Sequence, residues 1–151
     1  MEIIKYPNQK LYTKSKEVRL PLSKEDKALL DEMYSYVKEH KDEAVGLSAI
    51  QVGVPLRMCA IRRTINGKTF NYKLVNPKIL SHSYDTIALQ EGCLSVEEEH
   101  NEPVKRWKSI IVSGYDAITG KNVIIKADGF EARILQHEID HMDGILFIER
   151  F

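Results

Sequence analysis

Residues 129–142 read GFEARILQHEIDHM, and they decide how the rest of the chain is arranged. Drawn as a helix, this segment carries Phe130 and Ile134 on one side and Leu135 and Ile139 on another. A helix that presents apolar side chains nearly all round lies inside a protein rather than on its surface. We therefore expect this segment to be a buried helix against which other elements pack.

Both ends of this helix are marked in the sequence. Asp128 and Glu131 have the spacing of a capping box, in which side chains bond free backbone N–H groups of the first turn. Gly144 follows the last apolar residue and tolerates the left-handed conformation that ends many helices. These signals predict a helix over residues 129–142.

Within that helix, residues 137–141 form the pattern H-E-x-x-H. Histidines four residues apart on a helix have Cβ atoms about 5–6 Å from each other, so both imidazoles reach one metal ion. Glu138 lies on the adjoining surface, where its carboxylate faces water at the metal without binding the ion. The same spacing occurs by chance on solvated helices, but buried imidazoles require partners. We expect His137 and His141 to be metal ligands and Glu138 to be a general base.

A catalytic metal site needs a third protein ligand and one open position. In the extended metalloprotease pattern this ligand falls at Phe147, which cannot bind metal, and Glu149 is too close in sequence to reach back to the same ion. The upstream candidates are Cys59, Cys93, His82 and His100. Cys93 follows Gly92, whose flexibility lets the backbone approach the site, whereas Cys59 lies in an apolar run and is interpreted as a small buried hydrophobe. We expect Cys93 to be the third ligand.

The remaining sequence predicts an α+β fold. Ser23 with Asp26 marks the start of an amphipathic helix over residues 24–40. Between residues 56 and 127, β-branched and aromatic runs are separated by turn pairs at 66–67 and 119–120, which indicates antiparallel hairpins. Residues 1–151 contain no repeat and no linker, so we expect a single domain. Its mostly antiparallel β-sheets pack around the buried C-terminal helix with the H-E-x-x-H motif, and the amphipathic helix lies nearer the N-terminus.

Composition excludes several classes of partner. Lysine plus arginine and aspartate plus glutamate both number 22, so no net charge attracts nucleic acid or an anionic membrane surface. No apolar run approaches 18 residues, and no secretory leader stands at the start. The two cysteines are too few for a disulfide scaffold. We expect a cytoplasmic protein without nucleic-acid or membrane binding.

A further segment, residues 45–55, combines small residues with the single amide side chain of Gln51. Taken alone, such a segment is typical of a tight loop that enters a strand; read with the two other segments, it offers the Gln51 amide to the site. A neutral amide N–H stabilises an oxyanion without competing for the metal as a carboxylate would. Gln51 is therefore a candidate oxyanion donor.

Together, three segments resemble the three ordered motifs of the peptide deformylase family: AVGLSAIQ at residues 44–51, EGCLS at 91–95 and QHEIDH at 136–141. Residues 4–7 and 144–150 are similar to the family as well, so the resemblance spans nearly the whole chain. Ala44 stands where the family usually has glycine, and Ser48 where it has alanine. The arginine that many members carry near His100 is absent from this chain.

The resemblance implies a metal-dependent hydrolase that removes the N-formyl group from N-terminal formyl-methionine of nascent peptides and releases formate. It implies that Cys93, His137 and His141 bind one divalent metal ion per chain, with Fe2+ as the native metal and Zn2+, Ni2+ or Co2+ as substitutes. Glu138 would be the general acid/base, and Gln51 with the backbone N–H of Leu94 would form the oxyanion hole. The expected substrate contacts are Val45, Gly46, Leu47, Leu89, Glu91, Phe130 and Ile134.

N-formylmethionyl peptides of nascent chains are the expected partners. We expect no C-terminal extension for docking, and therefore only transient encounters with the ribosome. Two alternatives remain at this point: a zincin-type metallopeptidase that uses the same metal and Glu138, and a catalytically weak or inactive relative that binds peptides. We interpret Gln136, Ser95 and Asp140 as groups that support the ligands, with Arg106 as the charge partner of Asp140.

Overall fold

A computed structural model describes the whole chain, residues 1–151. It contains two α-helices, seven strands and three short 3-10 helices. In chain order these are η1 (Gln9–Tyr12), α1 (Lys24–Glu39), β1 (Gly46–Ser48), η2 (Ala49–Val52), β2 (Met58–Ile65), β3 (Lys68–His82), β4 (Thr86–Leu89), β5 (Val104–Trp107), β6 (Ser109–Asp116), β7 (Lys121–Asp128), α2 (Gly129–Met142) and η3 (Phe147–Arg150).

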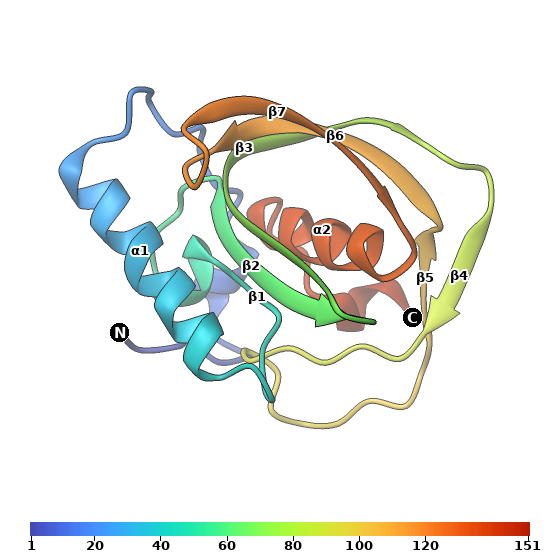
Figure 1. The fold of residues 1–151 in the computed structure, drawn as a ribbon. Coiled ribbons are helices and arrows are strands. Elements are labelled where there is room, and N and C mark those ends of the chain that lie inside the picture. Colours follow the sequence, from blue (N-terminus) through green and yellow to red (C-terminus); the bar gives the residue numbers. More distant parts are fainter.

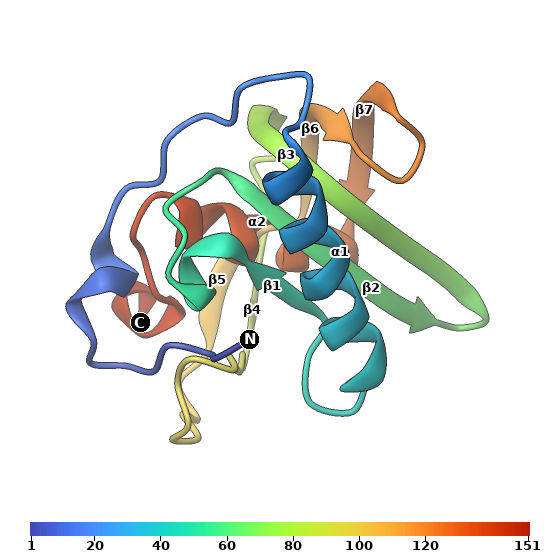
Figure 2. The same ribbon diagram turned by 90° about the vertical axis from the view of Figure 1, so that its left-hand side faces the viewer.

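The strands form two sheets, and every pairing is antiparallel. One sheet has the strand order β1-β2-β3-β6-β7, and the other pairs β4 with β5. Figure 1 shows α2 running through the middle of the molecule, with the curved larger sheet and the β4-β5 pair around it. Figure 2 shows α1 on the outer side of the larger sheet. The predicted α+β class, with antiparallel sheets and a C-terminal helix, is confirmed.

The larger sheet separates two apolar cores. Alternate side chains of a strand point to opposite faces of its sheet. In β2, Cys59 and Ile61 therefore pack with α2, whereas Met58 and Ala60 pack with α1. Because a helix covers each face, β2 is apolar at successive positions instead of alternating with polar residues.

The two helices begin in different ways. Ser23 accepts a hydrogen bond from the backbone N–H of Asp26 at 3.1 Å, which is the predicted cap of α1. The predicted capping box of α2 is wrong. Asp128 accepts from the Ser109 hydroxyl at 2.6 Å, and Glu131 accepts from the Tyr72 hydroxyl at 2.7 Å. These side chains bond to neighbouring strands, and α2 begins without a side-chain cap.

The turns explain where the strands reverse. Asn66 and Gly67 both have positive φ, 51° and 78°, as a two-residue hairpin turn between β2 and β3 requires. Gly120, at φ 72°, lies in the turn between β6 and β7, so both predicted hairpins are confirmed. Within the segment 45–55, residues 46–48 form β1 and pair with β2, and η2 follows directly.

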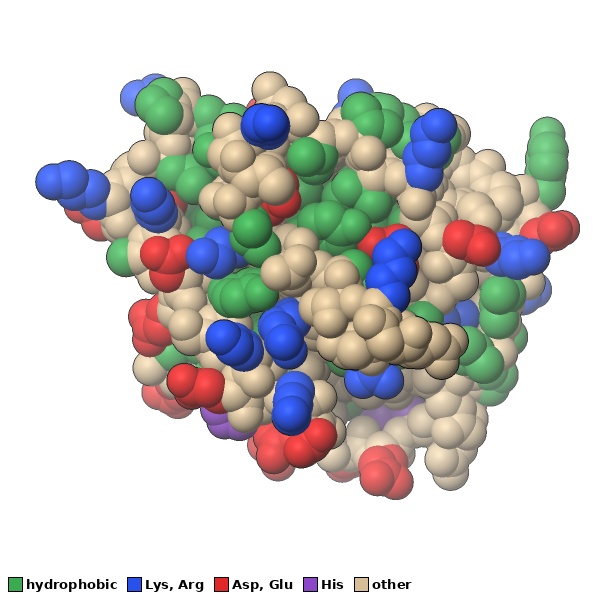
Figure 3. Space-filling model, viewed as in Figure 1, with side chains coloured by type: hydrophobic (Ala, Val, Ile, Leu, Met, Phe, Trp, Pro, Cys, Tyr) green, Lys and Arg blue, Asp and Glu red, His purple; other side chains and the backbone are tan.

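The surface agrees with the balanced composition. In Figure 3, basic and acidic side chains are interspersed on the face that is shown, with hydrophobic groups between them. None of the helices has the length and apolar character needed to cross a membrane.

Candidate metal centre and catalytic cavity

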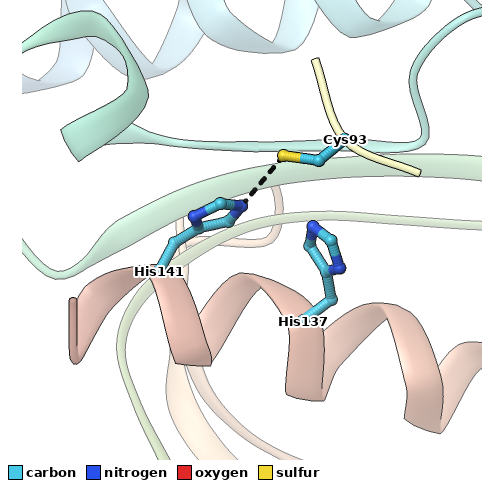
Figure 4. A group of neighbouring side chains, drawn as sticks. All are labelled: Cys93, His137 and His141. Atoms are coloured by element: carbon cyan, nitrogen blue, oxygen red, sulfur yellow. Dashed lines mark hydrogen bonds between the residues drawn. The ribbon is translucent and has the colours of Figure 1, made fainter. Parts of the chain in front are cut away.

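Three side chains from two parts of the chain meet at one point. His137 and His141 project from the same side of α2, and Cys93 reaches them from the loop between β4 and β5 (Figure 4). Their ligand atoms all lie within 4.8 Å of one another. The structure therefore brings together the three residues that the sequence predicted as ligands.

The geometry of this group fits a metal ion. Metal bonds of about 2.3 Å to sulfur and 2.1 Å to nitrogen, at tetrahedral angles, separate the two donor atoms by about 3.6 Å. Cys93 Sγ lies 3.4 Å from His141 Nε2. A thiolate and two imidazoles are donors suited to zinc and to divalent iron, cobalt or nickel. His82 and His100 take no part, because His82 stacks on Trp107 and His100 contacts Phe147.

His137 is oriented by a buried carboxylate. Its Nδ1 lies 2.8 Å from Glu91 Oε1, which assigns the proton to Nδ1 and leaves Nε2 free for a ligand bond. Burial lowers the pKa of His137, but Cys93 and Glu91 outweigh it and raise that pKa.

Glu91 itself belongs to a charge network that consists of Glu91, Arg106, Arg133, Asp140 and Arg150 and is buried except at Arg150. Arg106 donates to both Glu91 oxygens at 2.8 Å and to Asp140 at 2.6 Å, so the predicted Arg106–Asp140 pair is confirmed. Arg133 also donates to Glu91, and Arg150 donates to both oxygens of Asp140. Burial alone would raise the pKa of Glu91, but its bonds with Arg106 and His137 lower it well below its ordinary value.

His141 has a more apolar environment. It is 1% exposed, and its Nδ1 has no hydrogen-bond partner. Burial, followed by the nearby His137, lowers the pKa of His141 well below its ordinary value, so the ring is neutral as metal binding requires. Phe147, at the position of the third ligand in the metalloprotease pattern, is buried beside His137, with ring centroids 6.0 Å apart.

Glu138 lines the cavity but does not belong to the cluster of Cys93, His137 and His141. Its Oε1 accepts a hydrogen bond from the Ser48 hydroxyl at 2.9 Å. Its Oε2 lies where a side chain on Gly46 would begin, 2.6 Å from an added Cβ. Burial raises the pKa of Glu138, which makes it a stronger base than an exposed carboxylate.

The two expected oxyanion donors lie beside Cys93. The Gln51 amide is 3.0 Å from the Ser95 hydroxyl and 3.5 Å from Cys93 Sγ, and its own oxygen accepts from the Ser48 N–H. Leu94 lines the cavity, and its backbone N–H has no protein partner. Ser95 thus supports Gln51, and the Leu94 N–H is available to a bound molecule.

A cavity of about 300 Å³ opens beside these groups. Of the predicted substrate contacts, Val45, Gly46, Glu91, Phe130 and Ile134 line it.

Two predicted contacts do not line it. Leu47 is fully buried in the core against α1, because alternation along β1 turns its side chain to the other face of the sheet. Leu89, at the end of β4, is 47% exposed and lies outside the cavity lining.

Two residues matter more in the structure than the sequence indicated: Arg133, which no motif marks, and Glu91, which was expected only as a substrate contact. Arg133 is 5% exposed, lines the cavity and bonds Glu91. A signal was available, because Arg133, His137 and His141 are spaced by four residues and therefore share one side of α2. Glu43, at the cavity rim, was also missed, and nothing in its local sequence marks it.

Comparison with known proteins identifies relatives along the whole length of this chain. A family model described as Polypeptide deformylase matches residues 1–151. The peptide deformylase of Oceanobacillus iheyensis is 36% identical over 162 residues, which cover 99% of this chain and 88% of that protein. Peptide deformylase 2 of Geobacillus stearothermophilus is 38% identical with the same coverage.

Solved structures agree. Peptide deformylase from Ehrlichia chaffeensis superposes with a TM-score of 0.88 at 33% identity, covering 100% of this chain and 87% of that chain. The class I type b peptide deformylase from Acinetobacter baumannii, solved with Met-Ala-Ser bound, has a TM-score of 0.88 at 31% identity, with coverages of 100% and 98%. These relatives give no support to the metallopeptidase or inactive alternatives.

Proposed function

Since this chain belongs to the peptide deformylase family, we propose that Cys93, His137 and His141 hold the metal on which its hydrolysis of formyl groups depends. Members of the family remove the N-formyl group from the N-terminal methionine of nascent peptides, and this chain is such a hydrolase. The observation that carries the site assignment is the meeting of three ligand atoms within 4.8 Å beside a buried carboxylate.

We propose Fe2+ as the native metal, with Zn2+, Ni2+ and Co2+ able to replace it. The donor set of one thiolate and two imidazoles supports each of these ions. When bound, the ion supplies a Lewis acid that lowers the pKa of water and polarises the formyl oxygen.

Glu138 moves the proton in this proposal. Its carboxylate takes a proton from the attacking water and later gives it to the peptide nitrogen as the C–N bond breaks. The products are formate and a peptide with a free N-terminal amine. Two features of the site support this role: the raised pKa, caused by burial, and the Ser48 bond that fixes one carboxylate oxygen.

Gln51 and Leu94 are proposed to bind the oxygen that becomes negative during the attack. The partnerless Leu94 N–H at the cavity wall supports this assignment, as does the Gln51 amide beside Cys93. A donor of this kind contributes about 3–4 kcal/mol to stabilisation of the transition state in comparable hydrolases.

The cavity has walls that suit the methionine side chain of the substrate. Val45, Phe130 and Ile134 offer apolar walls, which suit an unbranched thioether. The A. baumannii relative was solved with Met-Ala-Ser, a peptide that begins with methionine. β1 is an edge strand, so its free edge offers backbone groups to an extended peptide.

We infer that the reaction takes place in the cytoplasm, on nascent chains and in transient contact with ribosomes. The direct test is formate release from formyl-Met-Ala-Ser after anaerobic loading with each metal in turn. An N-acetylated peptide and an internally cleavable peptide serve as controls. Cleavage of an internal bond, or absence of formate with every metal, would reject the assignment.

A further inference from the structure

The N-terminal segment lies against both expected oxyanion donors. We call residues 4–6 the N-terminal strap. The Ile4 N–H donates to the Gln51 carbonyl at 2.7 Å, and the Tyr6 N–H donates to the Ser95 carbonyl at 2.7 Å. Between them, Lys5 Nζ donates to the Leu94 carbonyl at 2.8 Å. Three consecutive residues thus hold η2, which carries Gln51, and the loop that carries Leu94.

The direction of the Leu94 N–H is set by a tight turn over residues 93–96. The Val96 N–H donates to the Cys93 carbonyl at 3.0 Å. In a trans peptide the C=O and the N–H point in opposite directions. The peptide between Cys93 and Leu94 therefore turns its N–H away from the interior of the turn. Any rotation of the turn moves this N–H.

The next peptide of the turn, between Leu94 and Ser95, is held by Lys5. Gly92, just before the turn, is exposed and has no atom within 4 Å of the position of a Cβ, so packing on that side does not fix the loop. A hydrogen bond from an ammonium group is stronger than one between neutral groups. Lys5 makes the only strap bond that comes from a side chain, and a substitution removes it without touching the backbone bonds.

We propose that Lys5 is a positioning residue for the reaction: by holding the Leu94–Ser95 peptide it fixes the turn, and with it the neighbouring Leu94 N–H, so that this N–H meets the developing oxyanion. This inference rests on the proposed function of Leu94. Lys5 does not contact the cavity itself. Its effect should therefore appear in kcat, where transition-state binding is measured, and not in the binding of the metal.

A second contact of Lys5 has to be separated from this one. Lys5 Nζ lies 3.7 Å from Glu97 Oε1, with side-chain exposures of 45% and 72%. Ion pairs as exposed as this one contribute little to stability. The Glu97→Gln variant removes the pair and keeps the Leu94 bond, and we expect it to behave as wild type.

The test compares Lys5→Met and Lys5→Gln with Lys10→Met in the fully metal-loaded protein. Lys10 is exposed in the same N-terminal region, and its side chain makes no hydrogen bond or ion pair. For both Lys5 variants we expect kcat on formyl-Met-Ala-Ser to fall about 3- to 10-fold, a fraction of what complete loss of a donor costs. KM, metal content and Tm should match those of Lys10→Met. Lys5→Arg, which keeps a charged donor, should recover most of kcat.

Two results would overturn the proposal. In the first, both Lys5 variants have the same kcat as Lys10→Met. In the second, kcat falls only in samples that also have a lower Tm or a lower metal content. Glu138→Gln, measured in parallel, separates this failure from failure of the proposed function. If Glu138→Gln is inactive while Lys5→Met is normal, the site assignment stands and only the strap is rejected. Full activity of Glu138→Gln would reject the site assignment itself.

Discussion

Gly46→Ala tests the position of the proposed base without changing any charged group. Gly46 does not have a positive φ, so the backbone of β1 accepts alanine. The added Cβ would lie 2.6 Å from Glu138 Oε2 and 2.9 Å from its carboxyl carbon. Pairing with β2 fixes the strand, so the flexible carboxylate has to withdraw.

The size of the displacement follows from the contact. Ordinary van der Waals separation begins at 3.4 Å, so moving Oε2 from 2.6 Å to that distance requires about 0.8 Å. A misplacement of about 1 Å in an active site can cost 10²-fold in rate. We expect kcat to fall about 10- to 100-fold, which corresponds to roughly 1.4–2.7 kcal/mol in activation free energy. The metal should remain, because Cys93, His137 and His141 are untouched.

The assay is formate release under saturating substrate, with metal content measured on the same sample. Gly114→Ala is the matched control, since its Cβ would lie 2.8 Å from Leu74 Cδ1, a contact made in the sheet and away from Glu138. We expect this control to lower Tm and to leave kcat per folded molecule unchanged. A metal-replete Gly46→Ala protein with wild-type kcat would refute the reasoning about Glu138, and so would loss of the metal.

Four other predictions concern the ligands, the base and the fold. Cys93→Ala should abolish metal binding and activity, whereas Cys59→Ala should leave both near wild type, because Cys59 is buried in the core and is not part of the metal cluster; elemental analysis decides this. Glu138→Gln should keep its metal while kcat falls by about 10² or more, since glutamine cannot accept the proton of water. Glu91→Gln should weaken metal affinity about 10- to 100-fold in a chelator competition, because Glu91 orients His137. Gly144→Ala should lower Tm without changing the site, since Gly144 has φ 75° and a Cβ there would lie 2.5 Å from the Tyr12 carbonyl oxygen; an unchanged Tm would contradict this.

The parts of the site that sequence predicts best lie within single motifs. Helical geometry fixes His137 and His141 relative to each other, so their spacing alone predicts that both bind one metal ion. The neighbouring Gly92 favours Cys93 over the other upstream candidates, and the structure brings Cys93 to the two histidines. The start of α1 at Ser23 also depends on adjacent residues alone.

The parts that sequence predicts poorly depend on contacts between distant segments. Asp128 looks like a helix cap, but Ser109 on β6 competes for its carboxylate, and that pairing is invisible along the chain. Leu47 was assigned to the cavity by its place in a motif. Its direction is decided by the pairing of β1 with β2, which a three-residue strand does not reveal. The same reason hides the strap bond from Lys5 to Leu94, which spans 89 residues.

The buried charge network also limits how this enzyme can change over generations. Glu91 and Asp140 stand among Arg106, Arg133 and Arg150, so losing Glu91 alone would leave Arg133 without a carboxylate partner and Arg106 with only Asp140, which Arg150 also binds. Breaking a buried pair on one side costs about 3–5 kcal/mol, a large part of the roughly 5–15 kcal/mol by which a folded protein is stable. Single substitutions at these positions are therefore selected against, and the arginines and carboxylates should change together. A lineage that replaces Glu91 is expected to have lost one of its arginine partners first.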